Sequence, residues 1–414
     1  MKLIKAGFLN AISTSIKIIS GFVVNKAVAV WVGPSGMAII GQFQSFISMI
    51  LMVANGGINN GIVKYVSEYS EDEQNRKKII STAFCISLIS SIFISVLLII
   101  FNKQLALFLL KKSYFNSIFI VLGLTLVLFS TNTFLISVLS GYKEIKKFVA
   151  VNMITSLVGL FLMIVLVYFF RLYGALLALA VVNSVVLFFT LIFVIKSHWF
   201  KISYFIQGID RESVKKLSKY ALMTMTTALT IPVSQIIVRN YLIMHISMSS
   251  AGIWQGLLKL SDAYLLIFTT TLTIYFLPKY SEIQDKTQLK REVYSGYKIV
   301  LPIVILTASL VYIFRESIVR ILFEDSFLPM TKLFIFEIVG DIFRISTLLV
   351  SLLIIAKTLT KWFIFFEILS SVLFILFSVF FVNQFGLIGV TYSYALLYFV
   401  CFLLNFMVVK IKLL

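Results

Sequence analysis

Nine ionisable side chains lie inside long apolar runs of this sequence, where charge is rare. Five are cationic and four are anionic: Lys17, Lys26, Arg239, Lys259, Arg344, Asp262, Glu337, Asp341 and Glu367. A single charge at the centre of a bilayer costs about 2.5–3.5 kcal/mol on insertion scales, so these groups must face water or one another. The sequence therefore predicts a polar cavity between helices.

The spacing of these charges places them on shared helix faces. Two sets are separated by four and then three residues, which puts each set on one side of a helix: Gln255, Lys259 and Asp262, and Glu337, Asp341 and Arg344. In each set the last two residues carry opposite charges. They could line the cavity, or they could serve only to neutralise each other.

Other polar residues occupy the first, second and seventh apolar runs. Lys17 and Lys26 are nine residues apart, which places them on opposite faces of an ideal helix. Pro232 precedes Arg239 and removes a backbone hydrogen bond, so we expect a kink or hinge there. The second run carries a polar stripe followed by a lysine near its end: Gln44, Ser48, Asn55, Asn59 and Lys64.

The elements that position these residues are membrane-spanning helices. The 414 residues are 60% apolar and 13% charged, with a mean hydropathy of +1.04, whereas soluble domains have about 45–50% and about 25%. The apolar runs are unbroken and lack the alternation of barrel strands, so the fold class is all-α. Twelve spans are predicted, at about 7–32, 37–62, 79–102, 114–141, 148–170, 174–195, 217–243, 250–277, 298–314, 331–356, 362–383 and 387–409.

The net charge of +19 is distributed unevenly among the connections. If both termini are cytoplasmic, 24 of the 36 Lys and Arg residues lie on the cytoplasmic side and 7 on the other. This is the bias of the positive-inside rule, so the basic excess indicates topology and not nucleic-acid binding.

The longest connection divides the chain into two halves. We predict an N-lobe of six helices over 1–196, a cytoplasmic linker over 197–216 and a C-lobe of six helices over 217–414. Halves of six spans repeated in parallel are a known transporter design with the substrate site between them.

Several classes of site are excluded. Cys85 and Cys401 lie in apolar runs, and His198 and His245 are far apart in sequence, so neither a metal centre nor a disulfide framework is expected. The chain has no P-loop motif for nucleotide hydrolysis. We expect no cofactor, no metal and no enzymatic activity.

Several short segments resemble one transporter family. GIWQG at 252–256, SDAYL at 261–265 and GINNGIVKY at 57–65, together with Lys17 and Lys26, are similar to the Wzx-type flippases. These form the polysaccharide transport branch of the MOP exporter superfamily, and the likeness is strongest to members that carry enterobacterial common antigen units. The spans over 79–141 match poorly.

The resemblance implies a MATE-like fold, with two six-helix lobes around a central cavity that work by alternating access. It also implies a substrate, an undecaprenyl diphosphate carrying an O-antigen or enterobacterial common antigen repeat unit. The substrate would move from the cytoplasmic to the periplasmic leaflet of a bacterial inner membrane. Membrane lipids, and the glycan polymerase and chain-length regulator of the pathway, are the implied partners.

A diphosphate needs cationic partners, and Arg239 offers a bidentate fork. The residues expected to bind the diphosphate and sugars are Lys17, Lys26, Asn55, Asn59, Lys64, Arg239, Gln255 and Lys259. Those expected to balance charge, or to bind a coupling proton or sodium ion, are Asp262, Glu337, Asp341 and Arg344. Pro232 is the expected hinge.

Two other functions remain open on the sequence. A cation-coupled multidrug exporter of the same superfamily predicts a cavity dominated by carboxylates, whereas here bases slightly exceed acids. A multispan polymerase or ligase acting on the same lipid predicts a large periplasmic loop, and the longest outward connection is only about 315–330.

Overall fold

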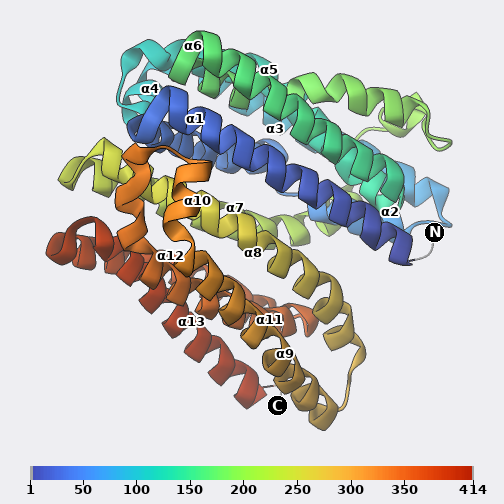
Figure 1. Ribbon diagram of the computed structural model, residues 1–414. Helices are drawn as coiled ribbons and strands as arrows, with labels where there is room; N and C mark the ends of the chain where they lie inside the picture. The colour runs from blue at the N-terminus through green and yellow to red at the C-terminus, as the bar shows by residue number, and fades with distance from the viewer. Residues whose placement is uncertain (1–2, 413–414) are drawn as a thin grey trace. The chain divides into compact units, whose positions relative to one another are not determined.

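The computed structural model describes residues 3–412, and the regular structure within that range is helical (Figure 1). The α-helices are α1 (Leu3–Ala54), α2 (Asn59–Glu68), α3 (Glu73–Ile100), α4 (Asn102–Leu110), α5 (Asn116–Gly141), α6 (Ile145–Ile195), α7 (Arg211–His245), α8 (Met248–Glu282), α9 (Lys286–Ile313), α10 (Arg315–Leu322), α11 (Phe334–Ala356), α12 (Thr360–Phe385) and α13 (Gly389–Lys412). Short 3-10 turns are η1 (Ser113–Phe115), η2 (Ile202–Tyr204), η3 (Asp325–Leu333) and η4 (Gly386–Ile388).

Nine helical segments among the described residues are long and apolar enough to cross a membrane. Three of them, Ala11–Ala54, Ile145–Ile195 and Thr360–Ile411, contain 44, 51 and 52 residues, although about 20 residues suffice for one crossing. Each is interrupted near its middle by a residue with positive φ: Gly33 at 73°, Arg171 at 51° and Gly386 at 64°. These residues fall in or next to the gaps that separate the predicted spans.

The second predicted span is too long at its C-terminal end. It was expected to reach residue 62, but α1 ends at Ala54 and a turn separates it from α2. Gly56 and Gly57 have φ values of 64° and 67°, a region that glycine enters without steric cost and that a helix cannot use. Asn59 and Lys64 therefore lie on a separate short helix.

The chain divides into two compact units, and the division does not follow the predicted linker. The first unit comprises Met1–Val32 and Ile39–Pro232, and the second comprises Gly33–Ala38 and Val233–Leu414. The boundary along the chain thus falls inside α7 at Pro232, and the whole connection 197–216 belongs to the first unit.

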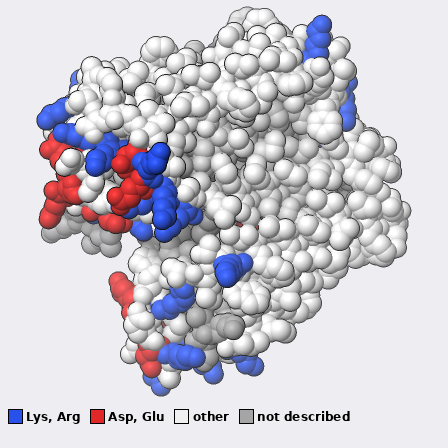
Figure 2. All heavy atoms as spheres, turned by 180° about the vertical axis from the view of Figure 1, so that it is seen from behind, with Lys and Arg blue, Asp and Glu red and all other residues white. Residues whose placement is uncertain are grey.

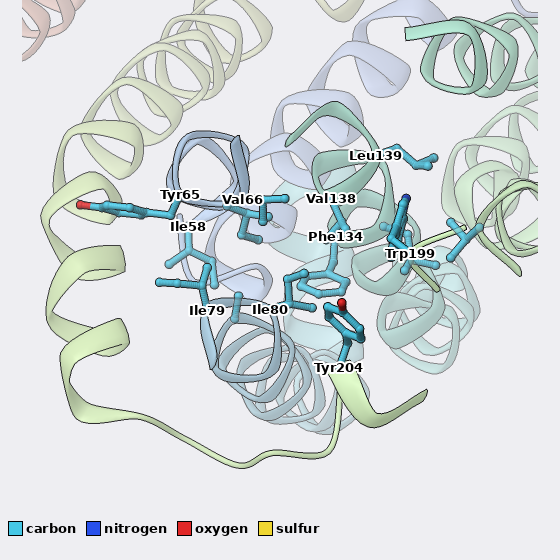
Figure 3. Close-up of a cluster of buried hydrophobic side chains, with 14 of the residues drawn as sticks. Ile58, Tyr65, Val66, Ile79, Ile80, Phe134, Val138, Leu139, Trp199 and Tyr204 are labelled. Atoms are coloured by element: carbon cyan, nitrogen blue, oxygen red, sulfur yellow. The ribbon is translucent and has the colours of Figure 1, made fainter. Parts of the chain in front are cut away.

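Aromatic side chains explain why that connection belongs to the first unit. Trp199 is 4% exposed and stacks on Tyr142, with ring centroids 4.2 Å apart, while its indole N–H donates to Glu144 at 2.9 Å. Tyr204 is also buried, and both join the hydrophobic cluster built from α2, α3, α5 and α6 (Figure 3). The connection is an anchored part of the first unit and not a free linker.

In the second unit, α11 packs against both α8 and α13, and these three helices carry the polar residues described below. The start of α8 also lies close to α1: a side-chain carbon at Gly252 would be 1.7 Å from the carbonyl oxygen of Pro34, so only glycine fits there. Apolar side chains such as Phe161 and Phe188, in the first unit, remain 66% and 65% exposed. Figure 2 shows a wide surface without charged side chains, as contact with lipid requires.

Candidate functional site: a buried polar cluster in the second unit

Asp341 is the centre of a polar cluster formed by α8, α11 and α13. Its side chain is buried, and its carboxylate accepts hydrogen bonds from the hydroxyls of Ser261 and Tyr264 on α8 and of Tyr394 on α13, the last at 2.9 Å. Hydrogen bonds to an ionised acceptor are about twice as strong as neutral ones. Three such donors from two neighbouring helices can hold Asp341 in its charged form.

A glycine next to Asp341 makes this arrangement possible. A side-chain carbon at Gly340 would lie 2.2 Å from the ring of Tyr394. Any larger residue would therefore displace that ring from α11 and break its bond to Asp341. The glycine of the sequence Val-Gly-Asp at 339–341 thus has a packing role in the cluster.

An ion pair extends the cluster toward the surface of the unit. The guanidinium of Arg344 donates to Asp262 at 3.0 Å and to the hydroxyl of Tyr394 at 3.3 Å, and it lies 6.0 Å from the ring centre of Tyr398. The side chains of Arg344 and Asp262 are 30% and 54% exposed. Solvent screening makes such a pair worth about 1 kcal/mol or less, so another anion can displace Asp262 from Arg344.

Glu337 lies one helical turn before Asp341 on α11, and the surroundings of its carboxyl are different. It is 1% exposed, and neither of its carboxylate oxygens has a hydrogen-bond partner among the described residues. An ionised carboxylate buried without partners carries a penalty of several kcal/mol. The neutral, protonated form is therefore the stable one at this position.

Arg239 does not fit the role predicted for it. Its side chain is 0% exposed, it donates to the amide oxygen of Gln255 at 2.5 Å, and it lies 5.6 Å from the ring centre of Trp254. A guanidinium that binds a substrate needs exposed N–H groups. Here the guanidinium is enclosed in the apolar packing of α7 and α8. Arg239 and Gln255, both predicted to bind the substrate, are brought together in an interior contact.

The shared face predicted on α8 exists, but its three residues differ in burial. Gln255 is buried, Lys259 is half-buried and Asp262 is exposed. Only Asp262 takes part in the cluster around Asp341. Glu367 is half-buried on α12.

Basic residues of the first unit are accessible. Lys17 is exposed and Lys26 half-buried on the part of α1 before Gly33. On α2, the Lys64 ammonium donates to the hydroxyl of Tyr220 at 2.6 Å, which raises the pKa of Lys64 above its ordinary value. Lys64 therefore stays cationic at all physiological pH values.

The two asparagines predicted to bind sugars have different surroundings. Asn55 is buried, and its amide oxygen accepts from the hydroxyls of Ser87 at 3.2 Å and Ser130 at 2.8 Å. Its polar groups are thus used to join α1 to α3 and α5 within the first unit. Asn59 is half-buried on α2, and its neighbour Asn60 is exposed and bonds Thr224 at 3.4 Å.

The sequence motif of a known family extends over most of the chain. The pattern described as "Polysaccharide biosynthesis protein" matches residues 29–332. The chain belongs to this family.

Relatives of this polysaccharide biosynthesis protein include two curated flippases. It is 29% identical over 407 residues to the Lipid III flippase of Escherichia coli (strain K12), covering 97% of both chains, and shows the same figures for the Lipid III flippase of Shigella flexneri. These relatives are named for a transport activity and not for catalysis.

Solved structures show which fold the polysaccharide biosynthesis protein adopts. An inward-facing multidrug resistance MATE transporter of the MOP superfamily matches with a TM-score of 0.80 at 16% identity, covering 94% of both chains. A MOP superfamily transporter from Pyrococcus furiosus matches with a TM-score of 0.73 at 16% identity, covering 98% of this chain and 96% of that one. The protein is thus an all-helical, multi-pass membrane protein with a MOP-type fold.

The hydroxyl groups of the cluster could not be found from charged residues alone. Ser261, Tyr264, Tyr394 and Tyr398 are uncharged, so a search for charged residues in apolar runs does not detect them. A signal was available: Ser261 and Tyr264 are three residues apart and Tyr394 and Tyr398 four apart, each pair on one helix face.

Proposed function

We propose that this protein is a flippase that moves an undecaprenyl diphosphate-linked oligosaccharide from the cytoplasmic to the periplasmic leaflet of a bacterial inner membrane. The observation that carries the proposal is the similarity to Lipid III flippases along 97% of the chain. Charged and polar groups inside the membrane-spanning region support it independently, because a diphosphate and its sugars need such groups to cross hydrocarbon. The repeat unit is an enterobacterial common antigen or O-antigen unit.

The proposal includes twelve spans with both termini in the cytoplasm. The breaks at Gly33, Arg171 and Gly386 would divide the three longest helical segments into six spans, which with the other six make twelve. The order of elements then repeats, because the short helices α4 and α10 each follow the third span of a half. The distribution of Lys and Arg supports the orientation.

The substrate would bind in a cavity between two six-helix halves that alternate their access. We assign the diphosphate to Arg344, since its guanidinium is partly exposed and its ion pair with Asp262 is weak. Lys17, Lys26, Lys64 and Lys259 would add positive charge along the path, and Asn59 would bind sugar hydroxyls. Arg239 and Gln255 would position α7 against α8, with Pro232 as the hinge.

The acidic residues are compatible with two sources of energy: a proton or a sodium ion bound at Glu337, Asp341 or Asp262. The glycan polymerase and chain-length regulator of the pathway would receive the product. The interior carboxyls are also what a multidrug exporter would use, so the test must separate the two functions.

The test in cells is deletion of the gene in its own host. Loss of the flippase should abolish or strongly reduce the surface glycan, and the lipid-linked oligosaccharide should accumulate with its head group facing the cytoplasm. A plasmid carrying the wild-type gene should restore the glycan. Unchanged surface glycan, together with increased sensitivity to cationic drugs, would reject the proposal in favour of drug export.

A further inference from the structure

The segment between α6 and α7, residues 196–210, has an inner and an outer side. On the inner side, Trp199 and Tyr204 are 4% and 2% exposed and enter the hydrophobic cluster of the first unit (Figure 3). On the outer side, three isoleucines are largely exposed: Ile202 at 66%, Ile206 at 73% and Ile209 at 56%. The segment is therefore amphipathic, although it lies outside the long helices.

Two buried hydroxyl residues of α3 hold the backbone of this segment. The hydroxyl of Ser81 donates to the carbonyl oxygen of Gly208 at 3.0 Å, and the N–H of Asp210 donates to the hydroxyl of Thr82 at 3.0 Å. Ser81 and Thr82 are both 0% exposed. Because the inner side is fixed in this way, the three isoleucines cannot turn inward to join the core. Their exposure is a property of the folded first unit.

An exposed apolar face of α6 leads directly into this segment. Phe188, Ile192 and Ile195 are 65%, 51% and 59% exposed, and their spacing of four and three residues places them on one face of the helix. Such a face is covered by lipid in a membrane-spanning helix, because contact with water is unfavourable for apolar side chains. Ile195 is the last residue of α6, so the chain enters the segment at a point that already faces lipid.

Basic side chains flank the isoleucines. Lys196, Lys201 and Arg211 are exposed, and in the described part of the chain none of them has a carboxylate within 4 Å. The acid next to Arg211, Glu212, pairs instead with Lys216 at 2.5 Å. Exposed apolar residues flanked by Lys and Arg are typical of segments that lie in the interface of an anionic membrane. Lipid phosphates carry the negative charge that these three cations lack.

We propose that residues 196–210 form a lipid-binding surface that lies in the interface of the cytoplasmic leaflet. The isoleucines insert among the acyl chains next to the head groups, and Lys196, Lys201 and Arg211 bind the phosphates of anionic phospholipids. The surface fixes the depth of the first unit in the membrane, because Trp199 and the hydroxyls of α3 tie it to the core of that unit. This inference goes beyond the proposed flippase function and takes from it only the orientation of the chain.

The first test measures the surroundings of Ile206. A nitroxide label is attached through Ile206→Cys, or through the control Gln284→Cys at an exposed position between α8 and α9. Both proteins also carry Cys85→Ala and Cys401→Ala, and both are reconstituted into vesicles of phosphatidylcholine and phosphatidylglycerol. The label at 206 should collide several-fold more often with oxygen, which dissolves in lipid, than with a water-soluble nickel chelate. The label at 284 should show the reverse preference.

The second test measures the preference for anionic lipid. The unfolding temperature of the full chain is recorded in detergent with added phosphatidylglycerol or phosphatidylcholine. One variant carries Lys196→Gln, Lys201→Gln and Arg211→Gln, and a matched variant loses three charges at the start of α9 through Lys286→Gln, Lys290→Gln and Arg291→Gln. Phosphatidylglycerol should stabilise the wild type and the matched variant more than phosphatidylcholine does. The first variant should lose most of this difference.

Several results would overturn the inference. One is preferential collision of the label at 206 with the nickel chelate. Another is an equal loss of lipid preference in both triple variants, which would show attraction by net charge alone. Spectral broadening by neighbouring labels at 206 would show that a second copy covers the isoleucines, and protection from the chelate in native membranes but not in these vesicles would indicate a protein partner. None of these measurements requires transport, so they are independent of the flippase proposal.

Discussion

Glu337 and Asp341 lie one turn apart on α11 and are equally buried, yet in the described part of the chain only the carboxylate of Asp341 accepts hydrogen bonds. One face of α11 therefore carries two buried carboxyls in different surroundings. In the proposed function, the exposed end of the cluster, at Arg344 and Asp262, binds the anionic part of the substrate.

Arg239 should be needed for folding more than for substrate contact. Arg239→Ala removes the partner of Gln255 and leaves a cavity beside Trp254, so we expect a loss of about 2–4 kcal/mol in stability. Thermal unfolding and the folded fraction in detergent measure this loss. Transport per folded molecule should fall less than tenfold. Normal stability with abolished transport would instead place Arg239 in contact with substrate.

Tyr264 and Tyr394 form a matched pair that separates stability from transport. Each donates to Asp341, so Tyr264→Phe and Tyr394→Phe should each destabilise the protein by about 0.5–3 kcal/mol. Only Tyr394 also bonds Arg344. Tyr394→Phe should therefore reduce transport more than Tyr264→Phe at equal folded amounts. Equal effects on transport would contradict a link through Tyr394.

Most of the helices could be predicted from the sequence, because the positions of charged residues and the lengths of apolar runs are local properties. The breaks at Gly33 and Gly386 could be predicted because these residues interrupt apolar runs. The common helix face of the charged residues at 337, 341 and 344 could be predicted from their spacing. The interior position of Arg239 could not be predicted, since it depends on how α7 packs against α8. The role of Asn55 could not be predicted either, because its partners Ser87 and Ser130 are distant in sequence.

The contacts of the predicted linker could not be predicted from the sequence either. Trp199 and Tyr204 lie in a polar connection. The sequence pattern does not indicate that Trp199 stacks on Tyr142 or that the hydroxyl of Tyr204 donates to Glu73. The polar composition of the connection correctly predicts a break between two apolar helices. Its attachment to the first unit depends on long-range contacts between aromatic side chains.

Trp199→Ala should release this connection from the first unit. Loss of the stacked ring and of the bond to Glu144 should cost about 3–5 kcal/mol, and Lys196 and Lys201 should become sites of rapid trypsin cleavage. His198→Ala is the control, since the His198 side chain is 84% exposed. Equal resistance of Trp199→Ala and His198→Ala to trypsin would show that the connection is held by other contacts.

Asp210 should make the start of α7 sensitive to acid. It accepts hydrogen bonds from the hydroxyl of Ser213 at 2.7 Å and from the backbone N–H of Ser213 at 2.8 Å, which lowers the pKa of Asp210 below its ordinary value of 3.8. Because the folded pKa is the lower one, the stabilisation is present above pH 3.8 and is lost as the pH falls through the folded value.

The measurement is the unfolding temperature of Asp210→Ala and the wild type as a function of pH. Removing this helix cap should cost about 0.5–2 kcal/mol at pH 7. The difference between the two proteins should shrink below pH 4. A difference that stays constant down to the lowest pH would mean that the charge of Asp210 has no part in capping α7.

Transbilayer movement in proteoliposomes tests the central claim most directly. Undecaprenyl diphosphate oligosaccharide is incorporated, and the head group is assayed for access to an impermeant glycosidase, with Arg315→Ala as a control for loss of positive charge outside the cluster. The wild type and Arg315→Ala should move the head group well above protein-free liposomes, and Arg344→Ala should be about 10- to 100-fold slower. No movement by the wild type, with pH-driven uptake of a cationic dye in the same vesicles, would contradict the account.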